Sequence, residues 1–293
     1  MIYDRLGYLL PAFLYVDILV LLGLLVHAVD FGRVVATVKT GRFWKKAGPA
    51  LAAAVLAFVV VATVPPRTNR IYYDEHIYMM IGRNIAEHGR AVMGNHVSFR
   101  HDDVQLLATE LNKEPNAWPV LGSLFFKVFG TDEMWGHVLN NLALVVGAAA
   151  VGFIVFLLLG SAWYGALGAL VHFTIPHNLL WSNIAAVEPV GAALAALSVA
   201  LALWYARHPR NPTLYTLAAL LVLTVQVRHE SLLIVPVVGI ILLFHDWRIV
   251  KNTHFWGATA LFAALCIPHF VHLFVYRHNP WGAGGPKFAL QHV

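Results

Sequence analysis

Eight long apolar runs are the feature that most limits how this chain can fold. A helix needs about 20 apolar residues to cross the hydrocarbon core of a bilayer, or somewhat fewer where the bilayer thins. The 293 residues are 59% hydrophobic and only 12% charged, whereas roughly a quarter of residues are charged in a soluble domain. We therefore expect one all-α polytopic transmembrane domain over residues 1–293. Its predicted spans are 8–28, 48–65, 135–159, 162–176, 184–206, 213–227, 231–245 and 255–276.

The first run is predicted to be a retained helix rather than a signal peptide. It is too long for the apolar region of a signal peptide, and Asp17 stands at its centre. An acid at that position is costly in a bilayer. We expect Asp17 to pair with a neighbouring helix or a partner subunit, in a structural or assembly role.

The basic residues of the short loops predict the orientation. Short cytoplasmic loops are enriched in Lys and Arg, and nine such residues fall in 29–47, 207–211 and 246–254, against four in the opposite short segments. The predicted location is the cell membrane, with both ends and an external loop, 66–134, on the extracytoplasmic side. Because the positive charges act as topology signals, the formal charge of +5 does not indicate a nucleic-acid partner. The nine residues are Arg33, Lys39, Arg42, Lys45, Lys46, Arg207, Arg210, Arg248 and Lys251.

The external loop is a polar island in an apolar chain, and function is expected there. Nine of the fifteen acidic residues lie between Arg67 and Glu133. Within it, 74–89 is predicted to be a helix that lies on the membrane surface or against the bundle, because Ile77, Ile81 and Ile85 recur on one side. A second helix is predicted over 119–129, ended by Gly130, and the segment 90–118 between them is expected to be irregular.

Asp74 and Glu75 follow the second predicted span directly. A carboxylate fixed at the start of a helix beside the low-dielectric boundary suits a general base for an incoming hydroxyl. The alternative is structural, with Asp74 as an N-cap and Glu75 as a partner of the helix dipole. Spacing alone leaves both interpretations open.

Arg228 and Glu230 lie between two short predicted spans, where charges are costly and are commonly functional. A guanidinium at that depth suits a phosphate, because it offers several donors at once. The alternative is a plain turn in which Arg228 pairs with Glu230. By topology, Glu188 belongs to the same outer end.

The histidines and the cysteine carry weaker signals. Four of the sixteen histidines, His172, His177, His269 and His272, could ligate a haem or zinc, but their spacing is not diagnostic, and interfacial histidines are more common. The single cysteine, Cys266, excludes an intrachain disulfide and a cysteine-based metal site.

Four segments in order resemble the GT-C superfamily of membrane glycosyltransferases. They are YYDEHIYMMIGRNIAEHG (72–89), KEPNAWPVLGSLFFKVFGTDEMWGHVLNNL (113–142), LLWSNIAAVEPVGAALAALSVAL (179–201) and VRHESLLIVP (227–236). The pattern is similar to the protein O-mannosyltransferase and aminoarabinose-transferase branch, whose members use polyprenyl-phosphate-linked sugars. This branch characteristically has an acidic pair in its first external loop, a Pro-containing segment before an amphipathic helix, and a short basic turn between later spans.

The resemblance implies inverting transfer of a sugar from a polyprenyl-phosphate carrier to an acceptor protein, lipid or glycan. It makes Asp74 the catalytic base with Glu75 beside it, and it puts Arg228 near the lipid phosphate. Lys113, Glu114 and Pro115 correspond to a loop that faces the donor, and Arg83 is a further candidate for donor binding. No cofactor follows with certainty. A divalent metal is left open, since the adjacent pairs Asp74–Glu75 and Asp102–Asp103 replace an Asp-x-Asp motif.

Two departures from the family pattern keep another function open. The helix 8–28 is additional, and the chain stops after the eighth run with WGAGGPKFALQHV, which resembles the start of an external loop. These features favour either an enzyme that needs another membrane subunit or a non-catalytic lipid-binding or scaffolding subunit. A histidine-ligated redox protein is the third alternative.

Overall fold

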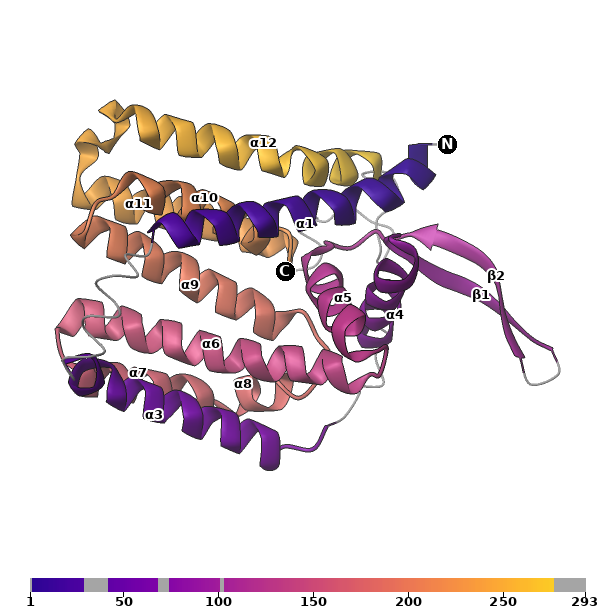
Figure 1. Ribbon diagram of the computed structural model, residues 1–293, viewed down its shortest axis with the longest axis horizontal. Helices are drawn as coiled ribbons and strands as arrows, with labels where there is room; N and C mark the ends of the chain where they lie inside the picture. Colours follow the sequence, from indigo (N-terminus) through magenta and orange to yellow (C-terminus); the bar gives the residue numbers. More distant parts are fainter. Residues whose placement is uncertain (1, 29–41, 68–73, 101–102, 277–293) are drawn as a thin grey trace, which may run out of the picture.

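The computed structural model describes residues 2–28, 42–67, 74–100 and 103–276, and it is predominantly helical. The long helices lie side by side along the long axis of the molecule, and the shorter α4 and α5 gather with a β-hairpin at one end (Figure 1). Some residues named in the sequence predictions lie outside the described residues, namely Arg33, Lys39, Asp102 and the segment 281–293. The elements are α1 (Ile2–Ala28), α3 (Arg42–Thr63), α4 (Asp74–His88), β1 (Val92–Arg100), β2 (Asp103–Leu111), α5 (Ala117–Phe129), α6 (Met134–Leu159), α7 (Ala162–Thr174), α8 (Pro176–Trp181), α9 (Glu188–Arg207), α10 (Asn211–Val225), η1 (His229–Leu233), α11 (Ile234–His245), η2 (Trp247–Lys251) and α12 (Thr253–Tyr276).

Four helices in the described part of the chain are long and apolar enough to cross a membrane. They comprise Arg5–Ala28 of α1, α6, α9 and Thr253–Val275 of α12. The other four predicted spans also form helices, but their apolar stretches are shorter, as in Gly48–Thr63 of α3. For example, α10 has 15 residues, which at 1.5 Å per residue reach about 22 Å, less than the roughly 30 Å hydrocarbon core. An apolar helical bundle is therefore confirmed, with four helices of spanning length.

Helix α10 forms the centre of one half of the bundle. Nearly every side chain from Thr213 to Val225 is buried, and the helix packs against α1, α9 and α12. A helix that is apolar on all sides must be enclosed by other helices or by lipid. In this fold the other helices enclose α10 and fix its C-terminal end, which leads into Arg228.

The predicted amphipathic helices form a layer across one end of the bundle. Ile81 and Ile85 of α4 are fully buried and Ile77 is partly buried, so the predicted apolar face is confirmed, and it packs against the bundle and α5. Trp118 of α5 is fully buried at the centre of this contact. The backbone turns at Gly130 with φ of +93°, which explains why α5 ends there.

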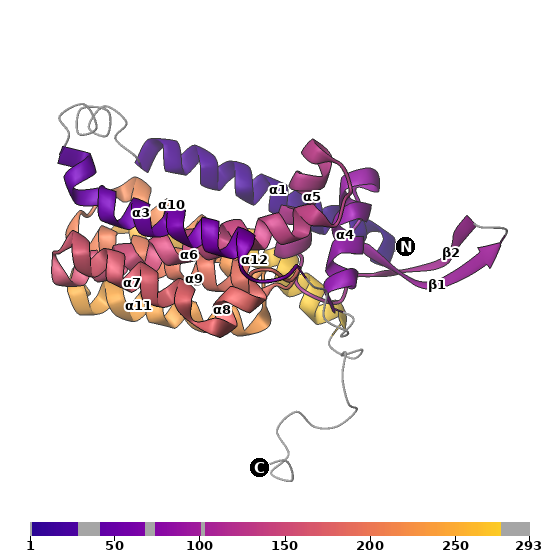
Figure 2. The same ribbon diagram turned by 90° about the horizontal axis from the view of Figure 1, so that it is seen from below.

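The prediction that 90–118 is irregular is wrong. Strands β1 and β2 pair in antiparallel register from Val92 opposite Leu111 to Arg100 opposite Asp103, with irregularities around His96. The hairpin projects away from the helices (Figures 1 and 2). The base of the hairpin joins the core, where Met93 and Leu111 are buried. A single pair of strands leaves only a weak period-two pattern in the sequence, so the segment resembled a loop.

Helix α1 reaches further toward this end than the sequence predicted. The Gly7 carbonyl accepts a hydrogen bond from the Ala91 amide at 2.8 Å, and the Tyr15 hydroxyl bonds the Ser123 hydroxyl of α5. The first half of α1 therefore contacts the layer formed by α4, α5 and the hairpin as well as α12. Asp17, two residues after Tyr15, lies near the middle of the apolar stretch Arg5–Ala28, as the sequence predicted.

Candidate functional site

A polar pocket lies where α4, the loop before α5, the start of α9 and the turn before η1 meet. Its cavity volume is about 230 Å³, below the roughly 300–1,000 Å³ of pockets that enclose drug-sized ligands. Such a space suits a small polar group. The lining residues are Asp74, Ile77, Tyr78, Met93, Asn112, Glu114, Val187, Glu188, Val227, Arg228, His229 and Glu230.

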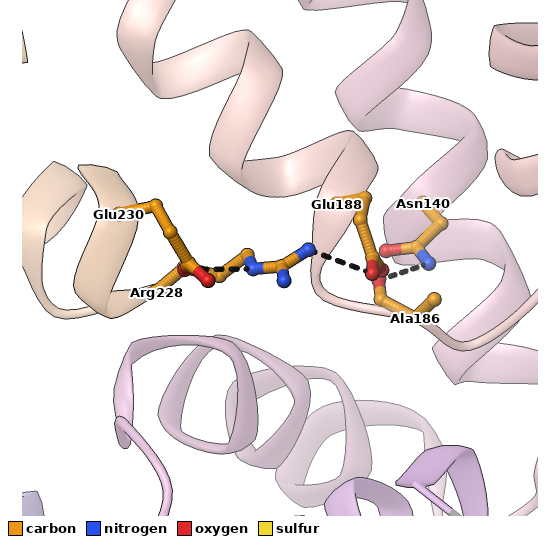
Figure 3. A network of polar contacts seen from close by, with 5 residues as sticks. All are labelled: Asn140, Ala186, Glu188, Arg228 and Glu230. Carbon is orange, nitrogen blue, oxygen red and sulfur yellow. Dashed lines mark hydrogen bonds and ion pairs between the residues drawn. The ribbon is translucent and has the colours of Figure 1, made fainter. Parts of the chain in front are cut away.

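Arg228 is the central cation of this pocket (Figure 3). Its Nη1 donates to Glu188 Oε1 at 2.8 Å, and its Nε donates to Glu230 Oε2 at 3.3 Å. The predicted pairing with Glu230 is therefore present, but the shorter contact is with Glu188, which lies 40 positions earlier in the sequence. The guanidinium has five N–H donors, so these two contacts leave further donors for a ligand.

Buried amides hold the backbone that leads into Glu188. Asn140 of α6 donates to the carbonyls of Ile184 and Ala186 and accepts from the indole N–H of Trp118. The contact to Ala186 is drawn in Figure 3. Fully satisfied buried networks of this kind rigidify the segment they bind. Glu188 is thus fixed at the first residue of α9, where a carboxylate also stabilises the helix dipole.

Asp74 and Tyr78 reach the pocket from one face of α4, because residues four apart lie on the same side of a helix. Asp74 is exposed at the start of α4, and Tyr78 is only 9% exposed. Burial raises the pKa of Tyr78 above its ordinary value, and the carboxylates of Glu114 and Asp74 add to that increase. The phenol therefore stays protonated at neutral pH and is available as a hydrogen-bond donor.

Glu114 enters the pocket from the loop that precedes α5. The side chain of Asn112 shapes this loop, since its Oδ1 accepts from the Glu114 amide and its Nδ2 donates to the Glu114 carbonyl. Burial raises the pKa of Glu114. The carboxylates of Asp74 and Glu230 act in the same direction, while His229 and Arg228 oppose them.

The pocket carries more acidic than basic groups. The carboxyl groups of Asp74, Glu114, Glu188 and Glu230 surround a single guanidinium, that of Arg228. Like charges at close range disfavour ionisation, which is consistent with the raised pKa of Glu114. An anionic ligand would bind here only if it displaced a carboxylate from Arg228 or if protons or a cation accompanied it.

Three of the predicted site residues lie outside this pocket. Glu75 is fully buried and does not line it, although Asp74 beside it does. Arg83 lies further along α4, with its Nη2 3.9 Å from Glu133 Oε1. Lys113 is partly buried in the loop beside Glu114 but is not part of the lining.

The histidines fall into two separate places. His172 and His177 lie on α7 and α8, while His269 and His272 lie on α12 near Asn112 and His229. Since α7 packs against α3 and α6 and α12 packs against α10 and α1, the geometry does not favour a haem held between His172 and His269. Among the described residues no group of three or more His, Cys, Asp and Glu side chains could hold a metal ion.

Sequence reasoning missed Tyr78, Asn112 and His229 as lining residues. Tyr78 could have been found from its spacing of four residues after Asp74. His229 lies within the Arg-His-Glu run that drew attention only for its charges. Asn112 carries no such signal, because its role depends on the fold of the loop.

No family model, curated protein or solved structure matches this chain.

Proposed function

We propose that this protein is a membrane glycosyltransferase that moves a sugar from a polyprenyl-phosphate carrier to an acceptor hydroxyl or amine, with inversion. The observation that carries the proposal is the convergence of Asp74, Glu114, Glu188, Arg228 and Glu230 in one pocket. These residues come from four separate segments of the sequence. They lie at the end of an apolar bundle, where a lipid headgroup could meet a water-soluble acceptor.

Asp74 is the general base in this proposal. The acceptor oxygen attacks the anomeric carbon and passes its proton to the Asp74 carboxylate, while the bond from that carbon to the phosphate oxygen breaks. Polyprenyl phosphate leaves with the electron pair. Asp74 is exposed at the pocket, as a base that meets an incoming acceptor must be, whereas Glu75 beside it is fully buried.

Arg228 binds the lipid phosphate. Its pair with Glu230 is the weaker of its two contacts, because the Glu230 side chain is 70% exposed and the donor distance is 3.3 Å. Exposed ion pairs contribute little free energy, so a phosphate can replace Glu230 while Glu188 keeps the guanidinium in place. Tyr78 of α4, which also lines the pocket, adds a neutral donor.

The eight helices that match the predicted spans cross the membrane in this proposal, the shorter ones with local thinning of the bilayer. The pocket end faces the extracytoplasmic side. The nine basic residues of the short loops support this orientation. So does the contact from Arg210 Nη1 to the Ala28 carbonyl at 3.3 Å, which groups the ends of α1 and α9 on one side.

Binding of polyprenyl phosphate to the purified full chain tests the proposal. Arg228→Ala should weaken binding about tenfold or more, because charge-assisted hydrogen bonds contribute about 1.5–3 kcal/mol, and Arg228→Lys should restore it only in part. Arg83→Ala is the matched control, since Arg83 lies outside the pocket. Equal affinity in Arg228→Ala and Arg83→Ala would refute the phosphate site.

A further inference from the structure

A second, smaller cavity adjoins the polar pocket and shares one residue with it. Its volume is about 90 Å³, well above the roughly 10–15 Å³ that a single water needs. Glu188 lines both cavities. The other lining side chains that bear on its chemistry are His172, His177, Asn178, Trp181 and Ala192.

The two carboxylate oxygens of Glu188 are in different situations. Oε1 accepts the 2.8 Å hydrogen bond from Arg228. Oε2 is buried and has no hydrogen-bond partner among the described residues. Nearly all buried polar atoms in folded proteins are paired, and an unpaired charged one is costly. This oxygen is therefore an acceptor that a ligand with an O–H group would satisfy.

The remaining wall of the cavity suits the carbon skeleton of such a ligand. The rings of His177 and Trp181 lie 4.6 Å apart at an angle of 30°, and together they present an aromatic surface. Asn178 is fixed beside them, because its Nδ2 donates to the His172 carbonyl. Aromatic faces for C–H groups together with a carboxylate for hydroxyl groups form a combination that binds neutral polyhydroxylated molecules.

We propose that this cavity is a subsite for a hydroxyl-bearing end of the acceptor, distinct from the phosphate site. An acceptor O–H donates to Glu188 Oε2, and its carbon atoms pack on His177 and Trp181. This inference rests on the proposed function. Glu188 then links the acceptor subsite to the phosphate site. Its Oε2 accepts from the acceptor, and its Oε1 positions Arg228, which binds the lipid phosphate.

The test uses Ala192→Leu, a change that fills the cavity without altering its polar groups. Ala192 lies one turn after Glu188 on α9, lines the cavity and is exposed, so the larger side chain can be accommodated. Ala149→Leu is the matched control, because Ala149 is also exposed but lies on α6 outside both cavities. Both variants should elute as folded, monodisperse protein.

Saturation-transfer NMR on the full chain in detergent measures binding of two probes, glycerol and methyl glucopyranoside. The glycerol signal should fall at least threefold in Ala192→Leu and stay unchanged in Ala149→Leu, while polyprenyl phosphate binds all three proteins equally. A parallel loss of the methyl glucopyranoside signal identifies a sugar acceptor, and its retention identifies a shorter polyol headgroup. Equal glycerol signals in Ala192→Leu and Ala149→Leu would overturn the subsite. Failure of the phosphate site would instead appear as absent polyprenyl-phosphate binding with the glycerol result intact.

Discussion

The pocket and the interior around Asp17 both contain acidic side chains, but their surroundings differ in whether the carboxylates have partners. In the pocket, Glu188 and Glu230 share Arg228, and every acid borders a cavity. Asp17 is 1% exposed, and neither of its oxygens has a hydrogen-bond partner among the described residues. Burial of an unpaired polar group is costly, so we expect the enclosed Asp17 to lower the stability of the protein. The acids of the pocket, by contrast, are arranged around a space that a ligand can enter.

This comparison also limits the role of Asp17 in assembly. Its carboxyl group is enclosed by the chain's own helices, so it does not face a partner subunit. The neighbouring Cys266 of α12 is fully buried as well. Asp17 is therefore placed to affect how α1 packs within the bundle rather than how the protein associates.

The largest expected effect comes from Asp74→Asn. General-base catalysis contributes about 10²- to 10⁴-fold, so transfer from a polyprenyl-phosphate sugar should fall at least a hundredfold. The helix should persist, because Asp and Asn have similar helix propensities and the loss of one charge in the first turn costs only about 0.3–1 kcal/mol. Glu87→Gln is the control, as Glu87 is an exposed acid on the same helix outside the pocket. Near-normal turnover by Asp74→Asn would remove it from the mechanism. Where turnover requires a second subunit, the assay is done on that complex.

Asp17→Val should make the protein more resistant to heat. Replacing a buried charged or polar group by an apolar residue of similar volume is often neutral or stabilising, by about 1–4 kcal/mol for ion pairs. We expect a longer half-life at a fixed elevated temperature in detergent. Asp17→Asn keeps a polar side chain at the same place and should give no such gain. A shorter half-life for both Asp17→Val and Asp17→Asn than for the parent protein would show that the carboxyl has a stabilising partner.

The smallest effect concerns Glu114 and pH. Because burial raises its pKa above the ordinary value of 4.5, the folded protein holds this proton more tightly than the unfolded chain. The resulting stability is fully present below 4.5 and is lost as pH rises through the higher folded-state pKa. Glu114→Gln should therefore lose less thermal stability than the parent protein as pH rises from 4.5 toward neutrality. Identical pH profiles for the two proteins would argue against a protonated Glu114.

Much of the fold could be predicted because apolar runs and helical periodicity are local signals. They placed a helix at each predicted span and at 74–89 and 119–129. The hairpin could not be predicted, since its two strands pair only with each other and such a pair leaves only a weak period-two pattern. The packing of α1 against α5 depends on contacts such as that between Tyr15 and Ser123, which lie 108 positions apart.

The site was predictable in part for the same reason. Charges beside apolar runs indicated Asp74, Glu188 and Arg228 individually, and the resemblance indicated Glu114. Their convergence depends on how α4, α9 and η1 pack, as does the separation of Asp74 from the buried Glu75. The contact between Arg228 and Glu188 joins residues far apart in the sequence, so only the structure reveals it.

The most direct test of the account is a structure of the full chain with bound polyprenyl phosphate. The account predicts phosphate density within hydrogen-bonding distance of the Arg228 guanidinium, with Glu188 still paired and with space for the sugar and the acceptor between the phosphate and the Asp74 carboxylate. Density for the phosphate elsewhere, with Arg228 still held by both Glu188 and Glu230, would contradict it.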